Sequence, residues 1–500
     1  MGRVRDPDDP GASGRSRRDT LGLDGLMVLP KFRRGFHVTQ GPAVSPLAGS
    51  RCPAISTEAA VPTRLPEGLM SKGTLIIGGS QAGLQVAVSL RQLGDTSPIT
   101  LVGEEEHPPY QRPPLSKEFL AGEAELDSLV FRTPGFYADF GIDLVCGERV
   151  CEVSLSPSGP PGPGVAMTTS GRELPFDRLA LTVGAGARRL PVPGADLDGI
   201  CYLREYNDAA DLRMRLATAT NVVVVGGGFI GLEVASAARA LGRSVTVVEA
   251  AERLMARSVG PVVSEFYRRA HLRRGVDVRL SSVVSGFQGE RDRVTSVKLS
   301  DGTHLPADLV LIGVGVLPRT ELPEQLGLVC DQGIVVDAHA RTSDPSIVAA
   351  GDCTVQPHPI TGEGRVRIES VHNAVAQAKV AAATLLGRVD NVISVPWFWS
   401  YQGDLKLQIA GLTTGYDSQV VRGDPDDGQF SVLYYRDDRL LAIDAVNRPA
   451  DYMAVRKALS QKATIAPDRA GDPAIPLKSL VNAGGSSSGT VKGIGEPLSA

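Results

Sequence analysis

The fold is decided by residues 221–249, which read NVVVVGGGFIGLEVASAARALGRSVTVVE. Four consecutive valines predict a buried strand of a parallel sheet. Gly226, Gly228 and Gly231 follow at G-x-G-x-x-G spacing, and the small and apolar residues after them predict a helix packed on that strand. A second strand then ends at Glu249, 23 residues after Gly226. This order of elements predicts a dinucleotide-binding unit.

Each part of this unit has a physical purpose. The first glycine permits a tight turn, the second lets the backbone approach a pyrophosphate, and the third lets helix and strand pack closely. The helix N-terminus offers free N–H groups and partial positive charge to the phosphates. The carboxylate of Glu249 can accept hydrogen bonds from an adenosine ribose. The alternative is a glycine turn of an ordinary α/β protein, but the agreement of all the parts favours a nucleotide.

The same logic occurs earlier in the chain, at residues 74–94, TLIIGGSQAGLQVAVSLRQLG. Gly78, Ser80 and Gly83 occupy the three key positions, with a serine in place of the middle glycine. Glu104 follows Gly78 by 26 residues, at the end of the next predicted strand, and is the candidate ribose acid. Two such units, 148 residues apart, suggest two cofactors, one of which donates electrons to the other.

Composition narrows the class of protein. The 500 residues are 42% hydrophobic and 22% charged, with a formal net charge of −4, which is typical of a globular protein and does not point to nucleic acid. No apolar run reaches the ~18 residues of a membrane span. Six cysteines in so long a chain do not suggest a disulfide scaffold, so we expect a reduced, cytoplasmic protein.

Residues 1–69 are rich in Gly, Pro, Ser, Arg and Asp and show no sustained periodicity. They predict a disordered extension, or a true translation start at Met70; an organelle-targeting segment is the less favoured alternative because acidic residues occur among them. The Gly- and Ser-rich residues 482–500 predict a flexible tail.

A proline-rich segment, HPPYQRPPLSK at 107–117, follows the first unit. Four prolines within seven residues exclude a regular helix or a central strand and predict a stiff loop. The loop presents Arg112 and Lys117, either as solvated cations or as contacts to a flavin.

Here the chain resembles a known family. The motifs that carry the resemblance are RPPLSK at 112–117, TVGAGAR at 182–188, AAGDC at 349–353, RIESVHNA at 367–374 and PWFWS at 396–400, together with the two glycine motifs. From about residue 74 to 481 the chain is similar to FAD-dependent, NADH-linked ferredoxin reductases of the putidaredoxin/rhodocoxin reductase type, within the glutathione-reductase-like superfamily.

The resemblance implies an α/β fold with two Rossmann-like dinucleotide-binding domains and an α+β C-terminal domain. The FAD domain is discontinuous and the NAD domain is inserted into it. The expected divisions are an extension at 1–69, the first FAD part at 70–189, the NAD domain at 190–317, the second FAD part at 318–394, the C-terminal reductase domain at 395–481 and a tail at 482–500.

The resemblance also implies cofactor contacts. Asp352 is expected to hold the ribityl chain of the flavin, although a short acid after Gly351 could equally be a helix N-cap. For FAD the matching residues are Gly78, Ser80, Ala82, Gly83, Glu104, Arg112, Lys117, Val150, Arg188, Asp352 and Val371, and for NAD they are Gly226, Gly228, Gly231, Glu249 and Gly315.

The sequence lacks the redox cysteines of many relatives, either C-x4-C soon after the first glycine turn or C-x-x-C in the NAD domain. Cys146 and Cys151 have x4 spacing but lie more than 60 residues after Gly78, and we interpret them as ordinary half-buried cysteines. The seven histidines show no pair at metal-ligand spacing, so no metal site is predicted. Electrons that enter the flavin as hydride are therefore expected to leave it directly, one at a time.

Three residues bear on catalysis and docking. Glu233 matches a family position near the nicotinamide, and a first-turn helix acid is an equally good interpretation. The resemblance places Trp399 near the flavin where the partner docks, rather than in the core. Lys379, on the helix after the ESVHNA segment, is a candidate to attract an acidic ferredoxin or is merely solvated.

The leading hypothesis is an NADH-dependent reductase of a [2Fe–2S] ferredoxin that supplies a cytochrome P450 or a ring-hydroxylating dioxygenase. An enzyme alternative is a flavin reductase of a small acceptor such as monodehydroascorbate or oxygen. A third is a flavoprotein whose redox state controls binding to another protein, as in relatives similar to apoptosis-inducing factor.

Overall fold

The computed structural model describes residues 71–156, 163–388 and 394–482. The predicted extension at 1–69 and nearly all of the predicted tail at 482–500 therefore lie outside the described residues. Within the described ranges, no helix is both long and apolar enough to cross a membrane.

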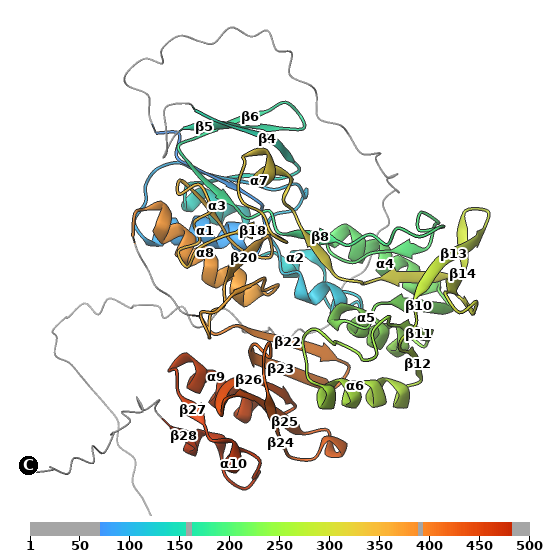
Figure 1. Cartoon of the computed structure of the whole chain (residues 1–500). Coiled ribbons are helices and arrows are strands. Elements are labelled where there is room, and N and C mark those ends of the chain that lie inside the picture. The colour runs from blue at the N-terminus through green and yellow to red at the C-terminus, as the bar shows by residue number, and fades with distance from the viewer. Residues whose placement is uncertain (1–70, 157–162, 389–393, 483–500) are drawn as a thin grey trace, which may run out of the picture. The chain divides into compact units, whose positions relative to one another are not determined.

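The first parallel sheet has the strand order β19-β7-β1-β2-β3. Its central strand β1 pairs in parallel with β2 and β7, and its residues are buried throughout. Helices α1 and α8 pack against each other, and α8 lies against β19. Because β19 comes from far beyond the second glycine motif, this sheet is discontinuous in sequence, as predicted. Figure 1 shows the same for the helices, where α8 in orange lies beside α1 in blue. The elements are β1 (Thr74–Ile77), α1 (Gln81–Gln92), β2 (Ile99–Val102), β3 (Ile142–Val145), β7 (Arg178–Leu181), β19 (Ile347–Ala349) and α8 (Val371–Leu385).

The second parallel sheet has the order β12-β11-β10-β16-β9. The four valines lie in β10, buried, and the predicted helix begins at Phe229, directly after the glycine turn. The sequence motif therefore folds as predicted. The elements are β9 (Ile200–Cys201), α4 (Tyr206–Thr218), β10 (Asn221–Val225), α5 (Phe229–Ala240), β11 (Ser244–Val248), α6 (Pro261–Arg273), β12 (Val276–Arg279) and β16 (Leu309–Ile312).

Two short strands join these sheets. β8 (Ala185–Ala187) leads out of the first unit and β17 (Val316–Pro318) leads back, and they pair antiparallel. Smaller antiparallel sheets are β4 (Val150–Leu155), β5 (Gly164–Thr168) and β6 (Glu173–Phe176), and β13 (Val284–Glu290), β14 (Arg293–Leu299) and β15 (His304–Pro306). A further small sheet holds β18 (Ile334–Val335), β20 (Thr354–Pro357) and β21 (Arg365–Val366).

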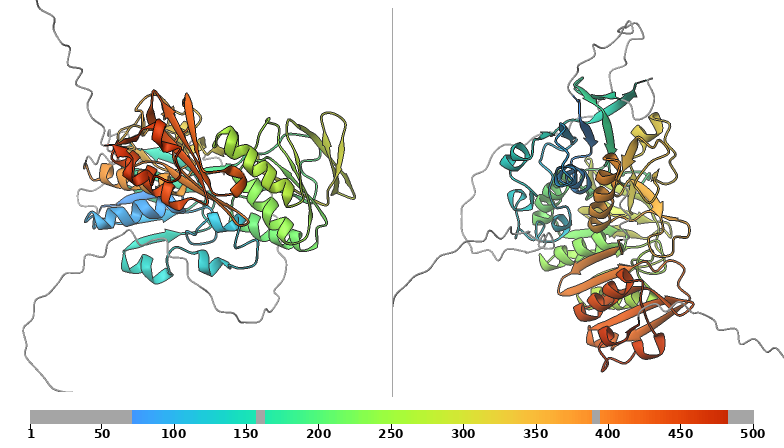
Figure 2. Two further views of the ribbon diagram at one scale, coloured as in Figure 1. Left: turned by 90° about the horizontal axis from the view of Figure 1, so that it is seen from below. Right: turned by 90° about the vertical axis from the view of Figure 1, so that its left-hand side faces the viewer.

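The C-terminal part is an antiparallel sheet in the order β22-β23-β26-β25-β24, with α9 packed on β26 and β23. Figure 2 shows this sheet in orange and red. The α+β C-terminal domain implied by the resemblance is therefore present. β24 was not predicted, because Ser418–Arg422 is mostly exposed and has no apolar alternation. The elements are β22 (Trp397–Gln402), β23 (Leu405–Gly411), β24 (Ser418–Arg422), β25 (Phe430–Arg436), β26 (Arg439–Val446) and α9 (Pro449–Ser460).

The proline-rich segment is more regular than predicted. Pro113–Ser116 form a single 3₁₀ turn, η1, with proline in its first two positions, where a missing N–H costs nothing. The other short elements are α2 (Leu126–Leu129), α3 (Pro134–Asp139), α7 (Glu321–Gln325), η2 (Pro425–Asp427), β27 (Thr464–Ile465), α10 (Pro467–Ala470), η3 (Leu477–Ser479) and β28 (Val481–Asn482).

Candidate functional site

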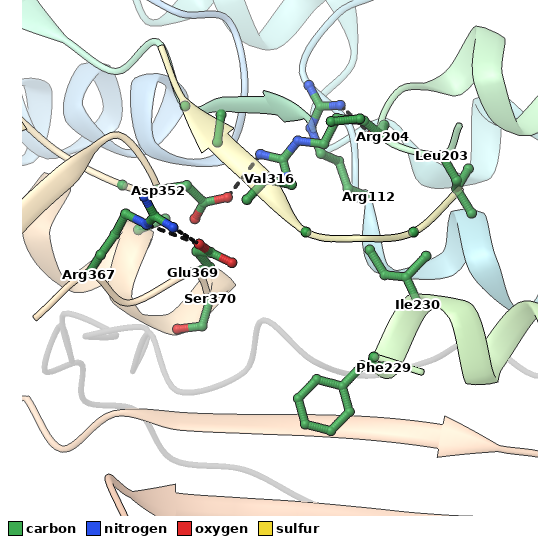
Figure 3. A pocket seen from close by; sticks show the side chains of 18 of the residues that line it. Arg112, Leu203, Arg204, Phe229, Ile230, Val316, Asp352, Arg367, Glu369 and Ser370 are labelled. Carbon is green, nitrogen blue, oxygen red and sulfur yellow. Dashed lines mark hydrogen bonds and ion pairs between the residues drawn. The ribbon is translucent and has the colours of Figure 1, made fainter. Parts of the chain in front are cut away.

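A cavity of about 1150 Å³ opens where the two parallel sheets and β22 meet. Both glycine turns line it, as do η1, the start of α8 and the tryptophans of β22. Figure 3 shows side chains of Arg112, Phe229 and Asp352, which come from separate segments, around the same space. Since the carboxyl ends of parallel strands carry ligands in such folds, the cavity lies where a nucleotide site is expected.

The first glycine turn has the geometry of a phosphate cradle. Gly78 has φ +120°, and a Cβ there would lie 2.1 Å from the carbonyl oxygen of Thr182. A Cβ on Gly83 would lie 2.0 Å from the carbonyl oxygen of Gly78. Both positions therefore require glycine. Ser80 is the N-cap of α1 but its side chain makes no capping hydrogen bond, so the helix N-terminus remains open to an anion.

The second turn repeats this arrangement. Gly226 has φ +110°, and a Cβ on Gly231 would lie 2.3 Å from the carbonyl oxygen of Gly226. In contrast, a Cβ on Gly228 would meet no described atom within 4 Å, because this residue faces the cavity. The open space beside an uncapped helix N-terminus fits the phosphates of a dinucleotide.

Glu249 is held in place by the backbone. Its carboxylate accepts hydrogen bonds from the N–H of Gly227 at 2.6 Å and of Ala251 at 2.8 Å. Arg253, the nearest cation downstream, instead donates to the carbonyl oxygens of Val259 and Ala256. The part of the cavity beside the second glycine turn, where the adenosine ribose of NAD would lie, therefore presents a fixed negative charge, which disfavours a 2′-phosphate.

Glu104, the corresponding acid of the first unit, lies between two arginines. Arg149 contacts it at 3.1 Å, and Arg319 forms a second ion pair with it. Burial alone would raise the pKa of Glu104, but the two guanidinium groups outweigh it and hold the pKa below its ordinary value. The carboxylate is thus ionised and able to accept hydrogen bonds from ribose hydroxyls.

Two further arginines reach the middle of the cavity (Figure 3). Arg204 pairs with Asp352 at 2.9 Å, and Arg112 donates to the carbonyl oxygen of Arg204 at 2.8 Å. Arg112 also pairs with Glu105 and lies 3.4 Å from the hydroxyl of Ser80. Positive charge therefore borders the glycine turn at the place where cofactor phosphates would lie.

A buried ion pair joins the two units. Lys117, at the end of η1, contacts the carboxylate of Glu233 on α5 at 2.6 Å. The hydroxyl of Ser116 donates to the same oxygen at 2.5 Å. Glu233 is only 4% exposed, so its charge is neutralised by Lys117 rather than by water. The sequence left open whether Glu233 lies near the nicotinamide or is a first-turn helix acid; in the structure it faces the cavity and lies beyond the first turn of α5.

The tryptophans of β22 form the wall of the cavity nearest the C-terminal sheet. Trp397 and Trp399 both line it, and their rings lie 5.3 Å apart. Trp397 also lies 5.1 Å from the ring of His372 on α8, and Arg456 of α9 lies 4.9 Å above it. Both tryptophans are half-buried, so this group connects the cavity to the surface.

Most of the residues predicted from sequence meet at this one cavity. Its lining includes Gly78, Ser80, Ala82, Glu104, Arg112, Lys117, Val150, Asp352, Val371, Gly226, Gly228, Glu249, Gly315, Glu233 and Trp399. Gly83 and Gly231 lie behind the turns, where they allow close packing, as a third glycine should. Arg188 and Lys379, both described, are outside the lining; Arg188 makes a backbone hydrogen bond to Gly315, and Lys379 is exposed.

Comparison with known proteins identifies the family. Residues 72–378 match the pyridine nucleotide-disulphide oxidoreductase family, and residues 397–481 match the reductase C-terminal family. The chain belongs to the first of these families and carries the second as its C-terminal domain. It is 44% identical to rhodocoxin reductase of Rhodococcus erythropolis over 405 residues, which are 81% of this chain and 93% of that protein.

Solved structures of similar oxidoreductases share the fold. A ferredoxin reductase for the CYP199A2 system from Rhodopseudomonas palustris has a TM-score of 0.78 and 42% identity, covering 82% of this chain and 100% of that one. The covalent putidaredoxin reductase–putidaredoxin complex has a TM-score of 0.78 and 40% identity, covering 82% and 98%. The chain is accordingly an FAD-binding, NAD(P)H-dependent oxidoreductase, as its two cradles indicate.

This oxidoreductase does not use the C-x4-C spacing as a disulfide. Cys146 has a free thiol, so it is not joined to Cys151. Burial raises the pKa of the Cys146 thiol, with a smaller contribution from Glu105, and this disfavours a reactive thiolate. Among the described residues, no group of three or more His, Cys, Asp or Glu side chains could hold a metal ion.

Proposed function

We propose that this protein transfers electrons from NADH to a [2Fe–2S] ferredoxin through bound FAD, and that the ferredoxin supplies a cytochrome P450 or a ring-hydroxylating dioxygenase. The observation that carries the proposal is the pair Trp397 and Trp399, which line the cavity and also reach the surface. A macromolecular acceptor can therefore approach the cofactor without entering the cavity.

The residues of this chain would bind the two cofactors, orient them and neutralise charge beside them. Glu249 favours NADH over NADPH through its fixed charge, and the first glycine turn with Arg112 and Arg204 would hold the phosphates of FAD. Lys117 and Glu233 place a neutralised ion pair beside the reacting region of the cavity. FAD, when bound, accepts a hydride from the nicotinamide and releases single electrons.

The surface around the tryptophans suits an acidic partner. Lys379 is exposed, and Arg456 lies over Trp397. Burial, Arg456 and Lys379 together lower the pKa of His372 to about 4, so its ring is neutral at pH 7. We call Trp397, Trp399, His372, Lys379 and Arg456 the aromatic patch. Its positive charge near pH 7 comes from Lys379 and Arg456, although the whole chain is acidic.

The proposal keeps the domain division predicted from sequence, with the NAD domain at 190–317 inserted into the FAD domain. It also places the protein in the cytoplasm.

The docking part of the proposal is tested by Lys379→Glu. We expect slower reduction of an acidic [2Fe–2S] ferredoxin and a weaker dependence of that rate on ionic strength, because the variant loses an attractive charge at the patch. Reduction of a small dye should change much less, since the dye needs no docking. The matched control is Lys298→Glu, which changes another exposed lysine, on β14.

Equal losses with ferredoxin and dye would indicate a damaged cofactor site. Unchanged ferredoxin kinetics would remove Lys379 from the docking surface. Comparable efficiency with monodehydroascorbate or oxygen, and none with ferredoxins, would instead support a small-molecule reductase.

A further inference from the structure

Strand β22 has two faces with different contacts. Trp397, Trp399 and Tyr401 alternate with Phe398, Ser400 and Gln402 along Trp397–Gln402. Phe398 packs on Phe229 at the start of α5, with ring centroids 4.7 Å apart. The second face is therefore directed towards α5, the helix that carries Glu233.

Ser400 is fully buried on this second face, and its hydroxyl donates to Glu233 at 2.6 Å. The bond goes to the carboxylate oxygen Oε1, whereas Lys117 and Ser116 contact Oε2. The two oxygens of Glu233 are thus held by different parts of the chain. One is fixed by the FAD-binding part of the chain and the other by the C-terminal sheet.

A chain of buried hydrogen bonds fixes the direction of the Ser400 hydroxyl. The side chain of Gln402 is fully buried, and its amide oxygen lies 2.8 Å from the Nε2 atom of His271. Its amide nitrogen donates to the Ser400 oxygen at 3.3 Å. Because Gln402 supplies a hydrogen to that oxygen, the hydroxyl proton of Ser400 is left to point at Glu233.

We propose that Ser400 is a positioning residue for the flavin reaction, which holds the Glu233 carboxylate in line with Lys117 from the C-terminal domain. A buried carboxylate that loses a hydrogen bond can turn away from its partner, and the remaining cation is then less well neutralised. The electrostatic environment of the cofactor is thereby set by β22, the same strand that carries Trp397 and Trp399. The inference rests on the proposed function, because it assumes that FAD binds beside Lys117.

The test compares Ser400→Ala with Ser431→Ala in the FAD-loaded protein. Ser431 is an equally buried serine of the same sheet, and its hydroxyl donates to a different buried carboxylate, Asp451, at 3.2 Å. Two quantities are measured: the flavin midpoint potential, titrated without NADH, and the single-turnover rate of flavin reduction by NADH.

For Ser400→Ala we expect the potential to rise, because Lys117 is less neutralised and positive charge favours the reduced flavin. We expect the NADH reduction rate to fall about tenfold despite the larger driving force, because Glu233 and Lys117 are no longer held in place beside the cofactor; loss of a hydrogen bond to a charged group has this size. Ser400→Thr, which keeps the hydroxyl, should restore both quantities, and Ser431→Ala should change neither. Gln402→Met should cause a smaller change in the same directions and provides the test if Ser400→Ala does not fold.

Wild-type-like potentials and rates in Ser400→Ala, or in Gln402→Met if only that variant folds, would overturn the inference. Equal changes in Ser400→Ala and Ser431→Ala would do so too, because they would reveal a general loss of packing. If the wild-type flavin is not reduced by NADH at all, the proposed function fails instead, and the two failures are therefore distinguishable.

Discussion

The buried carboxyl of Asp444 should make the protein lose stability as the pH rises towards neutrality. Asp444 lies on β26 and is completely buried; its Oδ2 atom accepts from the hydroxyl of Tyr434 at 2.6 Å. That hydroxyl accepts in turn from the N–H of Gly260, just before α6, so the contact joins the NAD-binding part to the C-terminal sheet. Burial raises the pKa of Asp444 to about 7, despite the hydrogen bond from Tyr434 that lowers it.

The sign and size of the effect follow from this pKa. A folded-state pKa of about 7 lies above the ordinary aspartate value of 3.8, so the folded protein binds a proton that the unfolded chain has lost. The contribution of Asp444 to the free energy of unfolding is fully present below pH 3.8 and decreases as the pH rises to about 7. At ~1.4 kcal/mol per pH unit, the loss between pH 5.5 and pH 8 is about 2 kcal/mol.

The perturbation is Asp444→Asn, which keeps the shape and removes the titration. The assay is urea unfolding of the FAD-loaded protein at pH 5.5 and pH 8, followed by tryptophan fluorescence. Both tryptophans lie on β22 in the affected sheet, so the signal reports on the correct region. We expect the variant to gain about 2 kcal/mol relative to wild type between the two pH values. A difference between variant and wild type that is the same at both pH values would refute the reasoning.

Three other predictions concern the cavity. Glu249→Gln should reduce the preference for NADH over NADPH at least tenfold in kcat/KM, because the fixed charge near the 2′ position is removed; an unchanged ratio would show that Glu249 does not set the choice. Arg204→Met should weaken FAD retention during gel filtration about tenfold through loss of a cation beside Asp352, and full retention would exclude Arg204 from the cofactor contacts. Cys146→Ser should leave ferredoxin reduction within twofold of wild type, whereas a large loss in a variant that keeps FAD would revive a thiol mechanism.

The features that could be predicted from the sequence are those that depend on residues close together in the chain. The glycine turns at Gly78 and Gly226 have backbone angles and close contacts that only glycine tolerates, and the strands and helices beside them follow from residue periodicity. The 3₁₀ turn at η1 was missed because proline excludes longer helices but permits a first turn. β24 was missed because an edge strand with an exposed face carries little apolar pattern.

The missed residues are those whose partners are distant in sequence. Arg204 is separated from Asp352 by 148 residues, Ser400 from Glu233 by 167, and Arg319 from Glu104 by 215. Periodicity reports only on neighbours within a strand or helix, so such pairs become visible only when the sheets come together. For Ser400, alternation along PWFWS gave a partial signal, because it placed the serine opposite the tryptophans.

We propose that electrons leave the flavin for a protein that binds at the aromatic patch. The most direct test of this proposal is NADH-dependent turnover of the purified, FAD-loaded protein with a panel of acidic [2Fe–2S] ferredoxins, with oxygen and with monodehydroascorbate. We predict that at least one ferredoxin is reduced with a kcat/KM well above both small acceptors, and that raising the ionic strength slows this reaction. Flavin that is reduced by NADH but passes its electrons to every ferredoxin more slowly than to oxygen or monodehydroascorbate would contradict the account.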